Sequence, residues 1–465
     1  MHKKLPEVFV SHAKMASQVS KELKKGGLRK LGSRVYTTNL IEAPELLIKR
    51  HMWFIVKELF PDAVIVDRTA LEHRAAPDGS IFIVSSKTRP VILPGLQIYP
   101  RKGHSALEED KPFIEKLYLS CPARAYLENL CERRTKKGMT PRILSRSELE
   151  DKLELFLQSA GQEALQKLRD EAKRIAKALD LEEEFRVLNG LIGTLLGSHQ
   201  SPMRSKLALA RARGLPYDPK RIDLFQMLYE ALVATPTPFR QISKSGSALP
   251  FFEAYFSNFI EGTEFQVNEA RDIIFEGKIP VNRPKDAHDI LGTYQIVSDL
   301  NEMKKSPKNG DELIDLLKQR HGILMQGRPE VSPGRFKTIQ NQAGMTLFVA
   351  PDLVEGTLKK GFEWMQGLMT PFQRAVYMMF LIAEVHPFVD GNGRCARMMM
   401  NAELVAADQA RIIIPTVFRD NYMSALKALT HTSRSEPLIR TLDFAQHYTS
   451  LIDWTNFEKA QAILT

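Results

Sequence analysis

Residues 386–397 read His-Pro-Phe-Val-Asp-Gly-Asn-Gly-Arg-Cys-Ala-Arg and lie between two apolar segments. Upstream, Thr370-Pro371-Phe372-Gln373 combines a capping box with proline at the first helical position, which predicts the start of a helix. A residue before proline is disfavoured in the α region, so we expect this helix to end at His386. A tight turn over 390–393 and a second buried helix over 394–406 complete the pattern. The stretch predicts a helix, a glycine-rich loop and another helix.

The loop has the composition of an anion-binding site. Gly391 and Gly393 allow backbone N–H groups to approach a ligand, and the following helix directs the positive end of its dipole toward the same place. Arg394 and Arg397 are three residues apart, so they project from one face of the first turns and can both reach phosphates. This spacing predicts a site for a phosphorylated ligand.

Two more side chains add chemistry to that site. Asp390 supplies a carboxylate suited to Mg²⁺ that also bridges phosphate oxygens, and His386 is the group whose ordinary pKa suits proton abstraction near neutral pH. Each residue alone has a structural explanation, as a helix end, a turn or a solvated charge. Eight specified positions together, however, would arise by chance roughly once in 10¹⁰ windows. The joint pattern predicts chemistry on a nucleotide's phosphates, with histidine as base toward an incoming hydroxyl.

The stretch resembles the signature of the Fic family, His-Pro-Phe-x-Asp/Glu-Gly-Asn-Gly-Arg-x-x-Arg, without departure, and the likeness extends over about 237–465. The resemblance implies a helical core and transfer of AMP from ATP to a Ser, Thr or Tyr hydroxyl of a target protein, with release of pyrophosphate. Related Doc-like kinases carry a basic residue where this chain has Gly393, so the glycine favours nucleotidyl transfer. The roles implied by position are general base for His386, Mg²⁺ ligand for Asp390, an anion hole for Gly391, Asn392 and Gly393, phosphate binding for Arg394 and γ-phosphate binding for Arg397.

Upstream of this stretch the sequence predicts a β-hairpin, with strands over 336–340 and 345–349 and a turn over 341–344. In the family that the chain resembles, a hairpin flap at this place holds the target segment by strand addition, which uses main-chain hydrogen bonds. Thr338, Ile339 and Gln340 are the implied target-binding residues. The alternative is a hairpin with a purely structural role.

Residues 257–262, Ser-Asn-Phe-Ile-Glu-Gly, match the family's inhibitory motif, Ser/Thr-x-x-x-Glu-Gly/Asn. Such a pattern should occur by chance about 0.4 times in a chain of this length. The resemblance implies that Ser257, Glu261 and Gly262 form an inhibitory element, in which Glu261 pairs with Arg397 and occupies the place of the γ-phosphate. A rival interpretation within the family is that Glu261 aligns water to remove AMP from modified protein.

The N-terminal segment is basic. Residues 1–50 hold eleven Lys and Arg against four Asp and Glu, which gives +7 of the chain's net +10. Concentrated positive charge is typical of a polyanion partner, because phosphate contacts dominate non-specific affinity for nucleic acid, although a solvated lysine-rich helix has the same composition. The elements expected are a helix over 5–25, a hairpin over 25–37, a helix over 44–59 and strands over 63–66, 81–84, 91–93 and 96–99.

Residues 1–130 resemble winged-helix regulators of the AbiEi antitoxin type, through the basic helix, the Gly-rich hairpin and the stretch Asp67-Arg68-Thr69-Ala70-Leu71. This resemblance implies DNA binding through the first helix and the wing. The alternative is a protein-docking module that presents targets to the enzyme. A rival function of another class is a DNA-binding regulator whose nucleotide site acts as a sensor. The implied phosphate-contact residues are Lys24, Lys25, Arg29, Lys30 and Arg34.

The chain of 465 residues is long enough for several domains. We expect a mainly α protein, with an α+β winged-helix-like domain over 1–130, a helical linker region over 131–236 that opens with a capping box at Ser145 and Glu148, and a Fic domain over 237–465. Three cysteines and the lack of a long apolar run predict a cytoplasmic protein with no membrane segment. ATP and Mg²⁺ are the expected cofactors, and the sequence leaves open whether the chain is a homo-oligomer.

Overall fold

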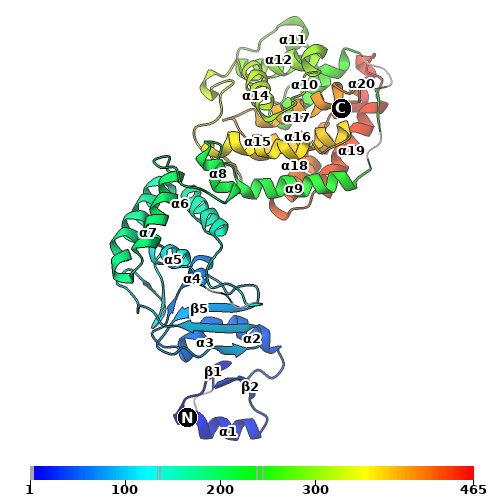
Figure 1. Ribbon diagram of the computed structural model, residues 1–465. Coiled ribbons are helices and arrows are strands. Elements are labelled where there is room, and N and C mark those ends of the chain that lie inside the picture. Colours follow the sequence, from blue (N-terminus) through cyan, green and yellow to red (C-terminus); the bar gives the residue numbers. More distant parts are fainter. Residues whose placement is uncertain (1–4, 134, 136–137, 237–238, 243–245, 465) are drawn as a thin grey trace. The chain divides into compact units, whose positions relative to one another are not determined.

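The computed structural model describes residues 5–133, 135, 138–236, 239–242 and 246–464, and the chain forms two compact units, residues 1–212 and 213–465 (Figure 1). The mainly α fold class with a small α+β region at the N-terminus is confirmed. The three-part division at 130 and 236 stays a prediction; part of its second boundary, at 237 and 238, lies outside the described residues. None of the helices in the described part of the chain is long and apolar enough to cross a membrane.

The first unit opens with a three-stranded antiparallel sheet in the order β1-β3-β2, on which one helix packs. Val8, Phe9 and Val10 are buried in succession and pair with β3, so the helix predicted over 5–25 was wrong for this run. Consecutive β-branched and aromatic residues suit a strand better than a helix. The predicted hairpin is confirmed. The elements are β1 (Val8–Val10), α1 (Ala16–Lys24), β2 (Arg29–Gly32) and β3 (Val35–Thr37).

A six-stranded mixed sheet follows, in the order β6-β7-β5-β4-β9-β8. The four predicted strands are confirmed, whereas the helix predicted over 44–59 is broken at His51, which has φ −103° and ψ 15°. The short strands β8 and β9 were not predicted. The elements are α2 (Pro44–Arg50), α3 (Met52–Leu59), β4 (Val64–Ile65), α4 (Asp67–Glu72), β5 (Ser80–Val84), β6 (Val91–Leu93), β7 (Leu96–Arg101), β8 (Lys111–Ile114), β9 (Leu117–Leu119) and α5 (Pro122–Leu130).

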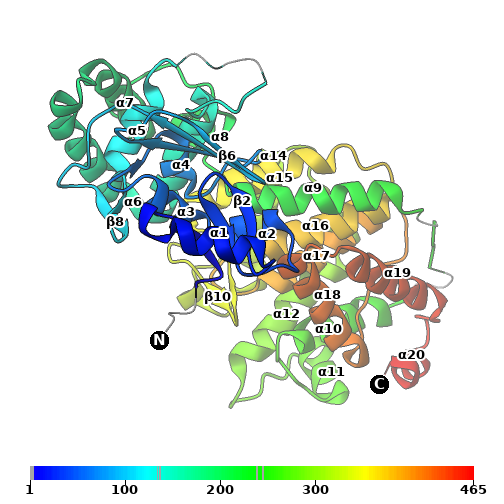
Figure 2. The ribbon, with the colours of Figure 1, turned by 90° about the horizontal axis from the view of Figure 1, so that it is seen from below.

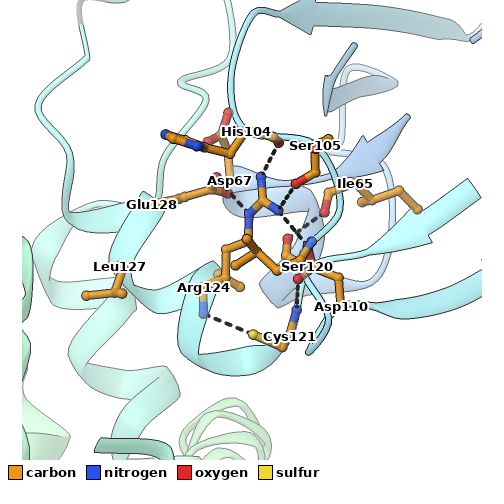
Figure 3. A network of polar contacts seen from close by, with 12 residues as sticks. Ile65, Asp67, His104, Ser105, Asp110, Ser120, Cys121, Arg124, Leu127 and Glu128 are labelled. Carbon is orange, nitrogen blue, oxygen red and sulfur yellow. Dashed lines mark hydrogen bonds and ion pairs between the residues drawn. The ribbon is translucent and has the colours of Figure 1, made fainter. Parts of the chain in front are cut away.

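A buried charge network fixes α5 to the loop before β8 (Figure 3). Arg124 is fully buried; its Nε donates to Glu128 at 3.1 Å and its Nη1 donates to Asp110 at 2.5 Å. The remaining hydrogen bonds go to the backbone oxygens of His104 and Ser105. Every nitrogen of this guanidinium therefore has an acceptor, which is the condition under which a buried charge is tolerated.

Three helices complete the first unit: α6 (Arg146–Ala176), α7 (Glu182–Leu195) and α8 (Lys206–Ala212). The predicted capping box is confirmed, because the Ser145 hydroxyl accepts from the Glu148 N–H and the Glu148 carboxylate accepts from the Ser145 N–H. The apolar faces of α6, α7 and α8 form one core with α5.

The second unit is a helical bundle around α16 (Pro371–Val385) and α17 (Asn392–Val405), which lie side by side in its middle (Figures 1 and 2). Residues 375–382 are buried on every face, as expected of a central helix. The capping box at Thr370 and Gln373 is confirmed. The surrounding helices are α9 (Pro219–Ala234), α10 (Ala248–Ile260), α11 (Val267–Glu276), α12 (Pro284–Ser298), α13 (Leu300–Met303), α14 (Gly310–Leu324), α15 (Val354–Met365), α18 (Arg419–Thr432), α19 (Glu436–Leu451) and α20 (Phe457–Leu464).

A short hairpin, which we call the flap (residues 337–348), precedes α15. Its strands are β10 (Gln342–Ala343) and β11 (Thr346–Leu347), joined by a two-residue turn. The predicted hairpin therefore exists, but its predicted strand over 336–340 and its predicted turn over 341–344 were wrong. Gly344 has φ +58°, so the turn forms at Gly344 and Met345, where the left-handed conformation is available without strain.

Candidate active site

The first helix of the motif ends at His386, as predicted. His386 has φ +53° and ψ 60°, a left-handed conformation that is uncommon for a residue with a side chain, and its N–H still donates to the Ile382 oxygen at 2.9 Å. The ring Nδ1 lies 3.2 Å from the Ala383 oxygen. Because a carbonyl only accepts, Nδ1 carries the hydrogen and Nε2 keeps its lone pair. Burial lowers the pKa of His386 to about 4, so the ring is neutral at physiological pH.

The second helix begins at Asn392, two residues earlier than predicted. Gly391 precedes it with φ +76°, and a Cβ at this position would lie 2.8 Å from the Met325 sulfur, so both conformation and space require glycine. The Asn392 side chain turns back to the loop: Oδ1 accepts from the Phe388 N–H at 2.8 Å and Nδ2 donates to the Phe388 oxygen at 2.9 Å. Asn392 thus fixes the shape of the loop.

Arg394 is buried against an acidic partner that the sequence did not predict. Its Nη1 lies 2.7 Å from Asp289 on α12 and 3.3 Å from the side-chain oxygen of Asn258 on α10. Asp289 also accepts from Arg328, at 3.0 and 2.9 Å. The guanidinium of Arg394 is therefore held in place by residues from two other helices.

Arg397 is held by the last turn of α10. Its Nε donates to the Ser257 hydroxyl at 3.1 Å, and its Nη2 donates to the Ser257 backbone oxygen at 2.7 Å and to Glu261 Oε1 at 2.7 Å. Helix carbonyl ends attract cations. Gly262 has φ +89° and, with the Thr263 N–H bound to the Asn258 oxygen, forms a Schellman cap that ends α10 beside the arginine. The pairing of Glu261 with Arg397 that the sequence implied is present in this geometry.

Gly393 makes the approach of Glu261 feasible. A Cβ at this position would lie 2.0 Å from Glu261 Oε1 and 3.1 Å from Arg397 Nη1. Any other residue would therefore displace the carboxylate. Glu261 can therefore lie beside Arg397 only because residue 393 has no side chain.

Asp390 is the exposed carboxylate of the loop. Its Oδ1 accepts from the Gly391 N–H at 2.6 Å and lies 3.7 Å from Arg394, while half of its side chain is open to solvent. Among the described residues there is no group of three or more acidic, histidine or cysteine side chains that could hold a metal by itself. A cation at this site would take Asp390 and ligand oxygens together, which is how Mg²⁺ usually binds beside phosphates.

His321 on α14 also shapes the loop and was not predicted. Its ring stacks on Phe388 with centroids 3.7 Å apart and planes within 1°. Its Nδ1 accepts from the Gly334 N–H at 2.9 Å, so Nε2 carries the hydrogen. This nitrogen donates to the backbone oxygen of Asp390 at 3.0 Å. Burial lowers the pKa of His321 to about 4.

The predicted target-binding residues of the flap are accessible. Thr338, Ile339 and Gln340 are exposed and precede β10, and Gln340 Nε2 donates to the Phe348 oxygen at 2.7 Å. The second strand is attached to the bundle, because Arg221 Nη2 donates to the Leu347 oxygen at 2.6 Å. The side of the flap that carries residues 338–340 is therefore open to solvent.

In the first unit, the five predicted DNA-contact residues do not all present a free charge. Arg29 is half-buried and donates to the backbone oxygens of Asn39 and Glu42. Arg34 donates to the Ser11 oxygen at 3.0 Å and Lys25 lies 3.7 Å from Glu22. Lys24 and Lys30 are exposed, and no partner for either of them occurs among the residues that the structure describes.

The second unit matches known proteins over its motif. Residues 312–404 match the model of the Fic/DOC family. Protein adenylyltransferase fic-1 of Caenorhabditis elegans is 28% identical over 181 residues, which are 38% of this chain and 36% of that protein. Protein adenylyltransferase Fic of Nematostella vectensis is 24% identical over 241 residues, which are 50% of this chain and 56% of that protein.

The chain thus spans between about a third and just over half the length of these curated relatives. A solved structure of Fic-1 from C. elegans aligns with 63% of this chain and 96% of its own, at 20% identity and a TM-score of 0.38. The family model covers the helix, loop and helix in which His386 and Arg397 lie, and the relatives carry the same family name. The match to the Fic/DOC family model thus lies within the second unit, over residues 312–404.

Proposed function

We propose that this chain transfers AMP from ATP to a hydroxyl of a target protein. In this reaction the hydroxyl oxygen attacks the α-phosphorus, an O–P bond forms, the bridging bond to the β-phosphate breaks, and pyrophosphate leaves. The hydroxyl proton passes to His386 Nε2. The observation that carries the proposal is the half-buried, neutral imidazole, whose Nδ1 donates to the Ala383 oxygen and whose Nε2 therefore keeps its lone pair, at the edge of a loop followed by a helix N-terminus.

The phosphates would lie against the N-terminus of α17 and the two arginines. Arg394 and Arg397 are both nearly buried, where charge acts more strongly than in water. Gly393 leaves room beside Arg397 for a phosphate oxygen once Glu261 has moved. Mg²⁺ fits this site if Asp390 and the phosphate oxygens hold it together, and when bound it would neutralise phosphate charge.

We further propose that Glu261 inhibits the transfer. Its carboxylate lies 2.7 Å from Arg397 and would compete with the γ-phosphate for that guanidinium. Ser257 holds the Arg397 guanidinium beside Glu261, because its hydroxyl and its backbone oxygen both accept hydrogen bonds from that guanidinium. The flap would present the target by strand addition along residues 338–340, which are exposed. The rival reaction, in which Glu261 aligns water to remove AMP, uses the same residues.

The test is labelling with ATP that carries its label on the α-phosphate, in the presence of Mg²⁺, with self-modification and lysate proteins as acceptors. We expect weak labelling by the wild type, strong labelling by Glu261→Gly and none by His386→Ala. A parallel reaction with γ-labelled ATP separates AMP transfer from phosphoryl transfer, since only the latter leaves that label on protein. Absence of α-label in every variant, with ATP still bound, would contradict the proposal.

DNA binding by the first unit is the second candidate function, favoured by the excess of positive charge over residues 1–50. Lys24 and Lys30 are its best-placed contacts because both are exposed. Retention of the full chain on duplex DNA should fall steeply as salt rises, since each phosphate contact releases counterions, and Lys24→Gln with Lys30→Gln should reduce that slope.

A cytoplasmic location is also proposed, since all three cysteines are buried and unpaired.

A further inference from the structure

The first end of the flap is hydrogen-bonded to four consecutive carbonyl groups, those of residues 385–388, where α16 ends and the loop begins. Both the side chain and the backbone of this segment take part. The contacts run from Lys337 Nζ to the Val385 and His386 oxygens at 3.4 and 2.7 Å, from the Lys337 N–H to the Pro387 oxygen at 2.9 Å, and from Asn341 Nδ2 to the Phe388 oxygen at 2.8 Å.

Lys337 is unusual because it is 3% exposed and none of its described contacts is a carboxylate. Its ammonium donates to the Asn341 side-chain oxygen at 2.7 Å and to the carbonyls that end α16. Burial, with a smaller contribution from the Arg221 charge, lowers the pKa of Lys337 to about 7. A buried ammonium is costly without compensation, and here the compensation comes from the negative end of α16. The lysine thus stabilises the left-handed turn at His386.

The returning strand of the flap contacts the same histidine. The Phe348 ring stacks on the His386 imidazole, with centroids 3.8 Å apart and planes within 8°. The Phe348 N–H donates to the Asn341 oxygen at 3.2 Å, which joins the two ends of the flap. The backbone of His386 is therefore held by one end of the flap and its ring by the other.

We propose that Lys337 is a positioning residue that couples the flap to His386, so that pairing of a target strand with the flap fixes the imidazole for proton abstraction. The proposal rests on the proposed AMP transfer and deepens it. A strand added at residues 338–340 lies between Lys337 and Asn341, the two residues that hold the loop. Binding energy from the target would then orient a group that the target itself does not need to contact.

The kinetic test uses the full chain with Glu261→Gly and measures self-labelling by α-labelled ATP. Lys337→Met should lower the maximal rate roughly tenfold to hundredfold, since small misplacements of a reacting group are costly, while the ATP concentration for half-maximal rate changes by less than about twofold. Lys337→Arg should restore most of the rate. Lys318→Met is the matched control, because Lys318 lies 4.7 Å from the Phe336 ring and makes none of the four contacts. An unchanged maximal rate in Lys337→Met would overturn the proposal.

A second measurement does not depend on labelling. Hydrogen exchange of the Phe348 and Phe388 amides reports the flap and the loop, since the first donates to Asn341 and the second to Asn392. In Lys337→Met both should exchange faster by a similar factor, whereas Lys318→Met should change neither. Faster exchange of only one of them would overturn the coupling. If Glu261→Gly labels nothing, the proposed transfer fails, and this exchange measurement still decides the coupling.

Asn341→Asp provides an independent variant. It keeps the oxygen that accepts from Lys337 and removes the donor to the Phe388 carbonyl. We expect a maximal rate between those of the parent and Lys337→Met. A rate equal to that of the parent would show that the Phe388 contact plays no part and would contradict the four-carbonyl linkage.

Discussion

Buried arginines are paired with carboxylates in both units of this protein, and the pairs of Arg124 in the first unit and Arg397 in the second differ in how exposed the carboxylate is. In the first unit, the side chains of Arg124 and Asp110 are both 0% exposed, and each guanidinium nitrogen has an acceptor. In the second unit, the Arg397 side chain is 6% exposed, whereas that of Glu261 is 36% exposed and belongs to a helix end. The pair of Arg124 and Asp110 is thus enclosed, whereas the pair of Arg397 and Glu261 has its carboxylate at the surface.

This difference decides what each pair can do. A carboxylate that is buried on every side cannot leave without unfolding its surroundings, so the Arg124 network serves the fold. Glu261 can rotate into water, where an exposed ion pair has little net value, and its departure would free Arg397 for another anion. An ion pair becomes a regulatory element when one partner can be solvated at low cost.

The largest effect that tests this comparison is on stability. Arg124→Met should lower the free energy of unfolding of the first unit by about 3–5 kcal/mol, because it leaves the Asp110 carboxylate buried without its cation. The measurement is urea unfolding followed by circular dichroism. Arg174→Met is the control. Arg174 pairs with Glu109, but its own side chain is 63% exposed, so its substitution should lower the free energy of unfolding by only about 0–1 kcal/mol. Equal effects of the two substitutions would remove the distinction between enclosed and exposed pairs.

Acid should destabilise the second unit selectively. His321 and His386 both have pKa values lowered to about 4 by burial, whereas an unfolded histidine titrates near 6.5. Between these values the unfolded state binds more protons, so stability falls as pH falls from about 6.5 to 4. We expect a loss of roughly 1 kcal/mol for each ring at pH 5.5 relative to pH 7.5. The arginines of the first unit keep their charge over this range.

The check is urea unfolding at the two pH values in variants that keep a single tryptophan, either Trp53 in the first unit or Trp454 in the second. The Trp454 transition should move to lower urea at pH 5.5 more than the Trp53 transition does. In a His321→Gln variant the shift should become smaller, because one of the groups with a lowered pKa is lost. Equal shifts for both reporters would mean that the buried histidines do not control the response.

The parts of the fold and site that could be predicted from sequence are those set by neighbouring residues. The helix start at Thr370 and the helix start at Ser145 depend on contacts within four residues, and both are confirmed. The end of α16 at His386 follows from the proline beside it. Local sterics and capping act over one turn, so one turn of sequence suffices.

The residues that were missed act across the fold. Asp289, His321 and Lys337 lie at least 48 positions before the motif residues that they contact, as in the hydrogen bond from Lys337 to the Val385 oxygen. One feature of the sequence could have indicated Asp289: it is a charged residue on a face of α12 whose other buried residues are uncharged. The strand β1 was missed because its partner β3 follows 25 positions later, and short apolar runs do not distinguish helix from strand.

The next effect is on activity. Glu261→Gly should raise self-labelling by α-labelled ATP roughly tenfold, the factor that corresponds to about 1.4 kcal/mol, while the free energy of unfolding changes by less than about 1 kcal/mol because the lost pair is partly solvated. Glu264→Gly is the matched control, an exposed glutamate three residues later that has no contact with Arg397. If both variants label like the wild type, the exposed pair is not regulatory.

The smallest expected effect on self-labelling is that of Gly393→Ala, which is also the most specific test of the pairing between Glu261 and Arg397. The added Cβ would lie 2.0 Å from Glu261 Oε1, so the carboxylate must move away from Arg397 even though its own residue is unchanged. Gly393 lies within the first turn of α17, where alanine is the better helix former, so the fold should tolerate the change. We expect self-labelling to rise only roughly threefold, less than in Glu261→Gly, because the Cβ also approaches Arg397 and takes part of the room that Gly393 leaves for a phosphate oxygen.

The double variant separates the two consequences of that methyl group. If Gly393→Ala acts by displacing Glu261, it should have no activating effect once Glu261→Gly is present, and the two substitutions should be strongly non-additive. If the methyl group instead improves nucleotide binding directly, it should raise labelling by the same factor in both backgrounds. Because Glu261 can move into water and Asp110 cannot, only the pair in the second unit can respond to so small a change without loss of the fold.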